Sequence, residues 1–359
     1  MCCLSQSSVE HVCSRYEGCK GDIVFDRTKS LDFDQTVTQI NMMLQDVAES
    51  LRIHGNQKFL IYFDINDQEY YGDRSVDLCT GSKPKNSTSY FNRYATASIV
   101  LGSLIFPIYF KPIRKEDSVR PYDLVKELVE TLESRFPVDR LLADGAFCTS
   151  DIVHYLEEKG VEFIFNMRSH KAVTDHIKRL RRTYMQTSDH IEFNAQKFYK
   201  WLKQTGQEYT EITTSYKYNP DVTFRVVLRA VLKKKKNQKN KRSFIVQFYT
   251  YCSNMRASRK YISKIYGRRW GVETYYRVID RFKGYTTSPA SIPRILLYGI
   301  GIVLVALWLR LNGLLNALKK GKILYFVVME QFPVFTSYIL LITGLFFCEL
   351  LQDKWCRRR

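Results

Sequence analysis

The sequence lacks the cysteine patterns that mark disulfide scaffolds and zinc sites. Its nine cysteines are irregularly spaced, and the one cluster is Cys2, Cys3, Cys13 and Cys19. A zinc site needs a repeated Cys-x-x-Cys or a His at ligand spacing, which this cluster does not have. An odd number of unpaired cysteines is typical of a reducing compartment. The start of the chain also lacks a basic region followed by an apolar stretch, so we expect no signal peptide and a cytoplasmic protein with free thiols.

Acidic residues are scarce relative to basic ones. The 359 residues include 55 Lys and Arg but only 36 Asp and Glu, which gives a formal charge of +19. A surplus of this size favours a polyanionic partner. Net charge alone leaves DNA, RNA and an acidic membrane surface open.

Long uncharged apolar runs are few. Ile295–Leu309 carries no charge but is shorter than the ~20 residues that a bilayer crossing requires, so we expect a buried helix. Phe332–Cys348 is closer to spanning length and lies in an apolar C-terminal tail, residues 313–359. Membrane contact by this tail stays an alternative.

The chain before residue 168 predicts a mixed α/β fold. A short N-terminal region, residues 1–56, contains one amphipathic helix at about Phe33–Arg52. Three strands follow, then helix, strand, helix and strand, and a polar loop at Gly81–Ser89 lies between the first two strands. This order predicts a mixed sheet with helices on its faces over residues 57–167. The expected elements are strands Lys58–Phe63, Tyr94–Leu104 and Ile105–Lys111, helix Pro121–Phe136, strand Leu141–Ala143, helix Thr149–Lys159 and strand Val161–Phe165.

Residues 168–255 interrupt that alternation. A basic helical stretch at Lys178–Arg182 precedes three strand-like segments, Tyr209–Tyr216, Thr223–Leu232 and Ser243–Tyr251. The last two flank a cationic segment that includes Lys233, Lys234, Lys235 and Lys236, which predicts a β-rich insertion with a basic hairpin. Two interpretations of the hairpin stay open: a solvated tip that keeps a sheet edge soluble, or a contact with a nucleic-acid backbone.

Two aspartates follow strand-like runs. Asp64 comes directly after Phe59–Phe63, and Asp144 comes after Leu141–Ala143 and before Gly145. Each alone is an ordinary turn or helix-cap residue. If the two strands are neighbours, at the ~4.8 Å spacing of a sheet, both carboxylates can share a divalent cation.

A helix predicted at Ser258–Phe282, in residues 256–312, carries a third carboxylate, Glu273. Tyr266, Arg269, Glu273 and Arg277 fall on one helical stripe, and apolar residues gather on another. A surface ion pair between Arg269 and Glu273 is the simpler explanation of part of this stripe.

These residues carry a resemblance. The string Tyr266-Gly-Arg-Arg269-Trp-Gly-Val-Glu273 resembles the Tyr-x-x-Arg-x-x-x-Glu signature of type-four insertion-sequence transposases, which are DDE enzymes. The surroundings of Asp64 and Asp144 are similar to the two aspartate blocks of that family. The resemblance covers about residues 58–310.

The resemblance implies a ribonuclease-H-like core and a chemistry. Asp64, Asp144 and Glu273 would hold two Mg²⁺ or Mn²⁺ ions, which suit hard oxygen ligands. Tyr266 and Arg269, with Arg277, Lys283 and the hairpin lysines, would contact double-stranded DNA at element ends and target sites. A homodimer in the DNA complex and a nucleoid-associated cytoplasmic location are further expectations.

The sequence departs from the family at one signature position and at both ends. Asp280 stands where the family has Lys, with Arg281 and Lys283 nearby as substitutes, and the region before Asp64 is short. Three alternatives therefore stay open: a ribonuclease-H-like nuclease without strand transfer, an inactive DNA-binding relic, and a membrane-associated protein built around the tail.

Overall fold

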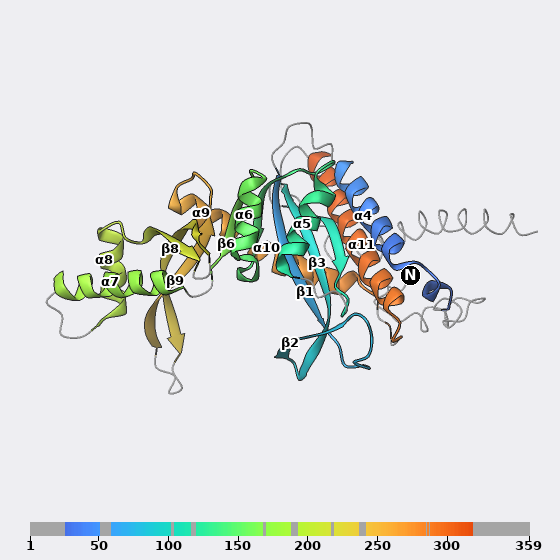
Figure 1. Ribbon diagram of the computed structural model, residues 1–359, viewed down its shortest axis with the longest axis horizontal. Helices are drawn as coiled ribbons and strands as arrows, with labels where there is room; N and C mark the ends of the chain where they lie inside the picture. The colour runs from blue at the N-terminus through green and yellow to red at the C-terminus, as the bar shows by residue number, and fades with distance from the viewer. Residues whose placement is uncertain are drawn as a thin grey trace, which may run out of the picture.

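The computed structural model describes residues 26–50, 59–101, 104–115, 120–167, 170–187, 193–216, 219–236, 242–284, 286 and 288–318. For Trp270, Val272, Glu273 and Thr274, only the backbone is described. The fold is mixed α/β, with one nine-stranded sheet flanked by helices. The sheet extends from a core into an insertion, which lie at opposite ends of the molecule (Figure 1).

The core half of the sheet has the ribonuclease-H-like strand order. Its strands are β1 (Phe59–Glu69), β2 (Cys79–Lys85), β3 (Thr88–Leu101), β4 (Leu104–Pro112), β5 (Val138–Ala143) and β6 (Glu162–Asn166). The order β2-β3-β1-β5-β6, with β4 also paired to β3, puts β1 at the centre. β3 is antiparallel to both β1 and β4, whereas β5 is parallel to both β1 and β6. The mixed α/β core expected from the sequence is confirmed, and β2 is a strand that the sequence did not predict.

Helices cover both faces of this sheet because β1 alternates its side chains between them. Phe63 points to one face, where its ring lies 5.0 Å from that of Phe147. Tyr62 points to the other and packs with Ile262 and Ile265. The helices around the core are α4 (Phe33–Glu49), α5 (Pro121–Leu132), the 3₁₀ turn η1 (Gly145–Phe147), α6 (Ser150–Glu158), α9 (Arg259–Gly267), α10 (Trp270–Phe282) and α11 (Ser291–Leu318).

The insertion continues the sheet. It contains α7 (Lys171–Thr187), α8 (Ala195–Gln204), β7 (Tyr209–Tyr216), β8 (Asn219–Lys236) and β9 (Arg242–Ser253). β9 pairs antiparallel with β6, so the insertion is joined to the core by backbone hydrogen bonds. The β7 to β9 meander confirms the expected strands, and α8 is an element that the sequence reasoning missed. Leu180 and Tyr184 of α7 pack with Phe198 and Leu202 of α8 in a separate small core.

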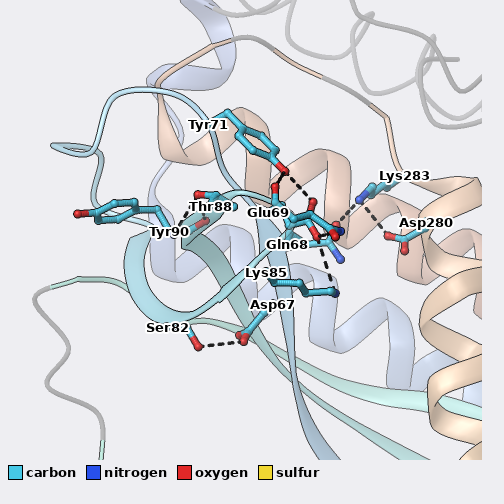
Figure 2. A network of polar contacts seen from close by, with 11 residues as sticks. Asp67, Gln68, Glu69, Tyr71, Ser82, Lys85, Thr88, Tyr90, Asp280 and Lys283 are labelled. Atoms are coloured by element: carbon cyan, nitrogen blue, oxygen red, sulfur yellow. Dashed lines mark hydrogen bonds and ion pairs between the residues drawn. The ribbon is translucent and has the colours of Figure 1, made fainter. Parts of the chain in front are cut away.

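β1 is longer than expected because its polar second half has partners. Asp64 lies in the middle of the strand, which continues to Glu69 paired with β3. The expected loop at Gly81–Ser89 is wrong, because β2 and β3 form a hairpin whose turn places Asn86 and Ser87 at positive φ. Figure 2 shows the polar contacts at this end: Glu69 is 3.8 Å from the Lys85 ammonium and accepts a 2.9 Å hydrogen bond from Tyr71.

The single helix expected at Ser258–Phe282 is two helices. α9 ends at Gly267 and α10 begins at Trp270. The amides of Arg268 and Arg269 bond to carbonyls three residues back, a tighter turn than an α-helix makes. Tyr266 and Arg269 therefore lie at a helix junction, and not within one continuous helix.

α11 is the apolar helix expected around Ile295–Leu309. Within the described part of the chain, one helix, at Ser291–Leu311, is long and apolar enough to cross a membrane, and 67% of its most apolar stretch is buried inside the protein. It packs between α4 and α10, as in a buried core helix. Gly299 allows this packing, because a Cβ there would lie 2.3 Å from a methyl carbon of Ile40. The Phe332–Cys348 stretch lies outside the described residues.

Candidate active site

Two of the three expected carboxylates lie side by side. β1 and β5 are parallel neighbours, and Phe63 pairs with Ala143, so Asp64 and Asp144 occupy the next positions on adjacent strands. The pairing between β1 and β5 ends at this point, which frees the two backbones to diverge. Asp144 precedes η1, and its side chain makes no capping hydrogen bond there. From the sequence, neighbouring strands were the condition for a cation shared by the two aspartates, and the structure meets that condition.

Two donors among the described residues contact Asp64. Its Oδ1 accepts a hydrogen bond from the Ile65 amide at 2.9 Å, and Arg269 Nη1 lies 3.0 Å from its Oδ2. The Asp64 and Arg269 side chains are only 20% and 18% exposed, so this ion pair is not a solvent-exposed surface pair. Arg269 comes from the α9–α10 junction, 205 residues away in sequence. The junction thus brings a cation to the first carboxylate.

Tyr266 supports the second carboxylate through the backbone. Its hydroxyl donates to the carbonyl oxygen of Ala143 at 3.4 Å, immediately before Asp144. Its ring packs on that of Tyr251 in β9 at 4.9 Å, and the Arg269 guanidinium lies 5.6 Å from the ring centre. Burial raises the pKa of the Tyr266 hydroxyl, and the negative charges of Asp144 and Asp64 raise it further against the opposing effect of Arg269. Tyr266 therefore remains a neutral hydrogen-bond donor.

Glu273 lies in α10, four residues after Arg269. Arg269 has helical dihedral angles, φ −56° and ψ −25°, so the helical spacing continues across the junction. Residues four apart lie on the same helix face, and the Glu273 backbone is therefore on the face that Arg269 turns towards Asp64. The side chain of Glu273 lies outside the described residues.

The remaining expected DNA contacts are distributed around the molecule. Arg277 is exposed on α10, and Lys233, Lys234 and Lys235 are exposed on β8. The Lys233 ammonium lies 5.0 Å above the Tyr249 ring, whereas the side chain of Lys236 lies outside the described residues. Figure 1 shows the described end of the β8–β9 hairpin far from β1 and α10. The hairpin lysines are therefore not part of the carboxylate site.

Lys283 is tied to the protein itself. Its ammonium is 2.9 Å from Asp280 Oδ1 and also donates to the amide oxygen of Gln68 in β1, as Figure 2 shows. Asp280 stands where the family signature has a lysine, and Lys283 was expected to replace that lysine. In the structure, these two residues contact each other. The Lys283 side chain is 19% exposed, so a DNA contact would require it to exchange partners.

Sequence reasoning missed three residues around the carboxylates. Tyr62 lies two residues before Asp64 on the same face of β1, and its hydroxyl is buried. Burial raises the pKa of Tyr62 to about 12, and the nearby cations of Arg268 and Arg269 partly oppose this. Thr96 and Tyr276 form a hydrogen bond beside Asp64. The strand pattern marked Tyr62 as apolar core, and no local signal could pair Thr96 with Tyr276.

The chemistry of the donors fits a divalent metal ion. Asp64 and Asp144 are hard oxygen ligands on neighbouring strands, which suits Mg²⁺ or Mn²⁺. Among the described residues, no group of three His, Cys, Asp or Glu side chains is close enough together to hold a metal, and Glu273 is not among the side chains described. Two candidate oxygen ligands are thus adjacent in the structure, whereas Glu273 is described by its backbone alone.

A ribonuclease-H-like sheet with an aspartate in its central strand beside an aspartate at the end of the neighbouring strand defines a class of proteins that act on nucleic-acid phosphodiesters. The sequence model of the transposase DDE domain family matches residues 115–307, just over half of the chain. The chain belongs to this family. The matched segment contains Asp144, Tyr266, Arg269 and Glu273, and it begins after Asp64.

Solved transposase structures show weak similarity to this chain. A synaptic complex of the piggyBac transposase with hairpin DNA has a TM-score of 0.46 and 13% identity, over 74% of this chain and 49% of that one. The Mos1 strand transfer complex has a TM-score of 0.20 and 10% identity, over 44% and 52%. The chain thus spans about half the length of these proteins. No curated protein sequence matches it.

Proposed function

We propose that this protein is a transposase that cuts DNA at the ends of an insertion sequence and joins the freed 3′-hydroxyl to target DNA. The observation that carries the proposal is the β1–β5 register, which places Asp64 beside Asp144. Membership of the transposase DDE domain family supports it. The Arg269 contact with Asp64 adds a phosphate-binding group at the same point.

The proposed cofactor is a pair of Mg²⁺ or Mn²⁺ ions. Asp64, Asp144 and Glu273 would hold the two ions. Such ions activate the attacking oxygen and stabilise the leaving oxygen of an in-line displacement at phosphorus. No protein nucleophile is required, and the protein residues bind, orient and neutralise.

Arg269 would bind two groups in turn, the Asp64 carboxylate and a DNA phosphate. In the structure, its guanidinium neutralises Asp64. When DNA is bound, the planar fork of donors suits a phosphate, which it can grip with two hydrogen bonds. The Tyr266 hydroxyl bonds to the carbonyl of Ala143, the residue before Asp144, and the Arg269 guanidinium lies beside the Tyr266 ring. The two signature residues thus position the second aspartate and the scissile phosphate.

The insertion would supply affinity for the DNA backbone. Residues 168–253 contain 19 Lys and Arg but only 6 Asp and Glu. Lys233 to Lys236, with Arg277 on α10, would contact phosphates of double-stranded DNA, both element ends and target. Lys283 would also contact phosphate after its ion pair with Asp280 breaks. A homodimer in the DNA complex and a nucleoid-associated cytoplasmic location belong to the same proposal.

The test is an incubation of the full chain with DNA duplexes that carry candidate element ends. We expect strand cleavage and joined products with Mg²⁺ or Mn²⁺. Ca²⁺ should support DNA binding without turnover, because it accepts looser coordination. Cleavage without any joined product would indicate a nuclease, DNA binding without cleavage would indicate an inactive relic, and robust cleavage in excess EDTA would exclude the metal mechanism.

A further inference from the structure

A buried hydrogen bond lies beside Asp64 and plays no part in the function proposed above. Thr96 of β3 is the register partner of Asp64 in the antiparallel β1–β3 pair. Directly paired residues project from the same face of a sheet, so the Thr96 and Asp64 side chains are neighbours. Thr96 is 2% exposed, and its hydroxyl is hydrogen-bonded to that of Tyr276 at 2.7 Å.

Tyr276 lies on α10, three residues after Glu273. Residues three and four apart share a helix face, so Arg269, Glu273 and Tyr276 follow one another along it. Arg269 contacts Asp64 and Tyr276 contacts Thr96, the residue paired with Asp64. Glu273 therefore lies between Arg269 and Tyr276 on the helix, and these two residues contact Asp64 and Thr96, which are paired in the sheet.

The start of α10 lies close to β4. A Cβ at Gly271 would lie 2.2 Å from Cδ1 of Ile105 in β4. This contact limits how far α10 can move towards the sheet but does not fix its rotation about its own axis. A directional hydrogen bond from a side chain one turn past Glu273 does fix that rotation.

We propose that Thr96 and Tyr276 form a positioning pair that holds the backbone of α10 around Glu273 next to Asp64 of β1. The proposal rests on the proposed function, because it takes Glu273 as a metal ligand. Neither hydroxyl touches the reacting atoms, and both act through the helix. Burial, with a smaller effect from the charge of Asp64, raises the pKa of Tyr276, so its hydroxyl stays protonated.

The test compares variants that keep the packing and remove the hydroxyls. Tyr276→Phe and Thr96→Val each delete one partner, and Thr96→Ser keeps the hydroxyl. Tyr275→Phe is the matched control: Tyr275 is the adjacent residue of α10, and its hydroxyl is buried without a hydrogen-bond partner among the described residues. The affinity of each full-length variant for Mn²⁺ alone is measured by titration calorimetry, and cleavage is measured at saturating Mn²⁺ and DNA.

We expect Tyr276→Phe and Thr96→Val to weaken Mn²⁺ binding about fivefold, an effect that one neutral hydrogen bond can support. The double variant should lose no more than either single one, because the two residues form one interaction. Thr96→Ser and Tyr275→Phe should bind Mn²⁺ as the wild type does. The cleavage rate should follow the same order while DNA affinity stays constant.

Unchanged Mn²⁺ affinity in Tyr276→Phe overturns the positioning role, whether or not the protein cuts DNA. An equal loss in Tyr275→Phe also overturns it, because the effect would then be general packing. If the variants show the expected affinities but the wild type never cuts DNA, the positioning pair stands and the proposed function fails. A wild type that binds no Mn²⁺ overturns both.

Discussion

The two ends of the sheet differ in what their side chains do. At the core end, Asp64 and Arg269 are mostly buried and paired with each other, and they lie against strands that are covered on both faces. At the insertion end, Lys233, Lys234 and Lys235 project from a two-stranded ribbon into solvent. Buried, oriented groups suit chemistry, whereas exposed flexible cations suit attraction to a polyanion. Under the proposed function, catalysis and DNA affinity lie at opposite ends of one continuous sheet.

The largest expected effect comes from removing a carboxylate at the core end. Asp64→Asn, Asp144→Asn and Glu273→Gln should each lower cleavage by roughly a thousandfold or more, since losing metal ligation forfeits about 4 kcal/mol of transition-state stabilisation. DNA binding should change little, because backbone attraction is a separate contribution. Cleavage rate and duplex affinity are measured on the same preparations. Near-normal cutting by any one variant would remove that residue from the site.

An intermediate effect should follow from changing the signature residues. Arg269→Lys keeps the charge but loses the planar fork, and Tyr266→Phe loses the hydrogen bond to Ala143. We expect strand transfer to fall roughly tenfold in each, a barrier change of about 1.4 kcal/mol, with almost no change in melting temperature. Wild-type strand transfer by Arg269→Lys at saturating metal and DNA would show that the Asp64–Arg269 pair is structural.

The smallest effect on turnover should come from the insertion end. Replacing Lys233, Lys234 and Lys235 with Gln should weaken DNA binding across all sequences and lower the salt-dependence slope by about one per lysine that contacts phosphate. Turnover at saturating DNA should be unchanged. Lys29, Lys126 and Lys159, which are exposed outside the insertion, provide a matched triple control. If both triple variants have the wild-type salt slope, the hairpin is a solvated tip.

Much of the fold and part of the site could be predicted from the sequence. Apolar runs ending at Asp64 and Asp144 predicted two strands, and the structure shows that these strands, β1 and β5, are neighbours. The extent of β1 could not be predicted, because its polar second half is a strand only through partners such as Lys85 and Arg93 elsewhere in the chain. The break between α9 and α10 at Arg268 was not predicted from the sequence either.

Contacts that depend on tertiary structure could not be predicted from the sequence. An ion pair between Arg269 and Glu273 was one interpretation of the helical stripe; the structure brings Arg269 to Asp64 across 205 residues, and the Glu273 side chain lies outside the described residues. Lys283 was expected to contact DNA, and in the structure it is bonded to Asp280 and Gln68. The DNA contacts of both cations stay predictions.

The proposed function requires that metal ions bind where β1, β5 and α10 meet. It is tested most directly by replacing Mg²⁺ with Fe²⁺ and adding ascorbate and peroxide, so that hydroxyl radicals cut the protein backbone near the bound metal. We expect fragments that end near residues 64, 144 and 273 and none that end near 233–236. In Asp64→Asn, the fragments near 64, 144 and 273 should disappear. Fragments at other positions, or the same fragments in Asp64→Asn, would contradict it.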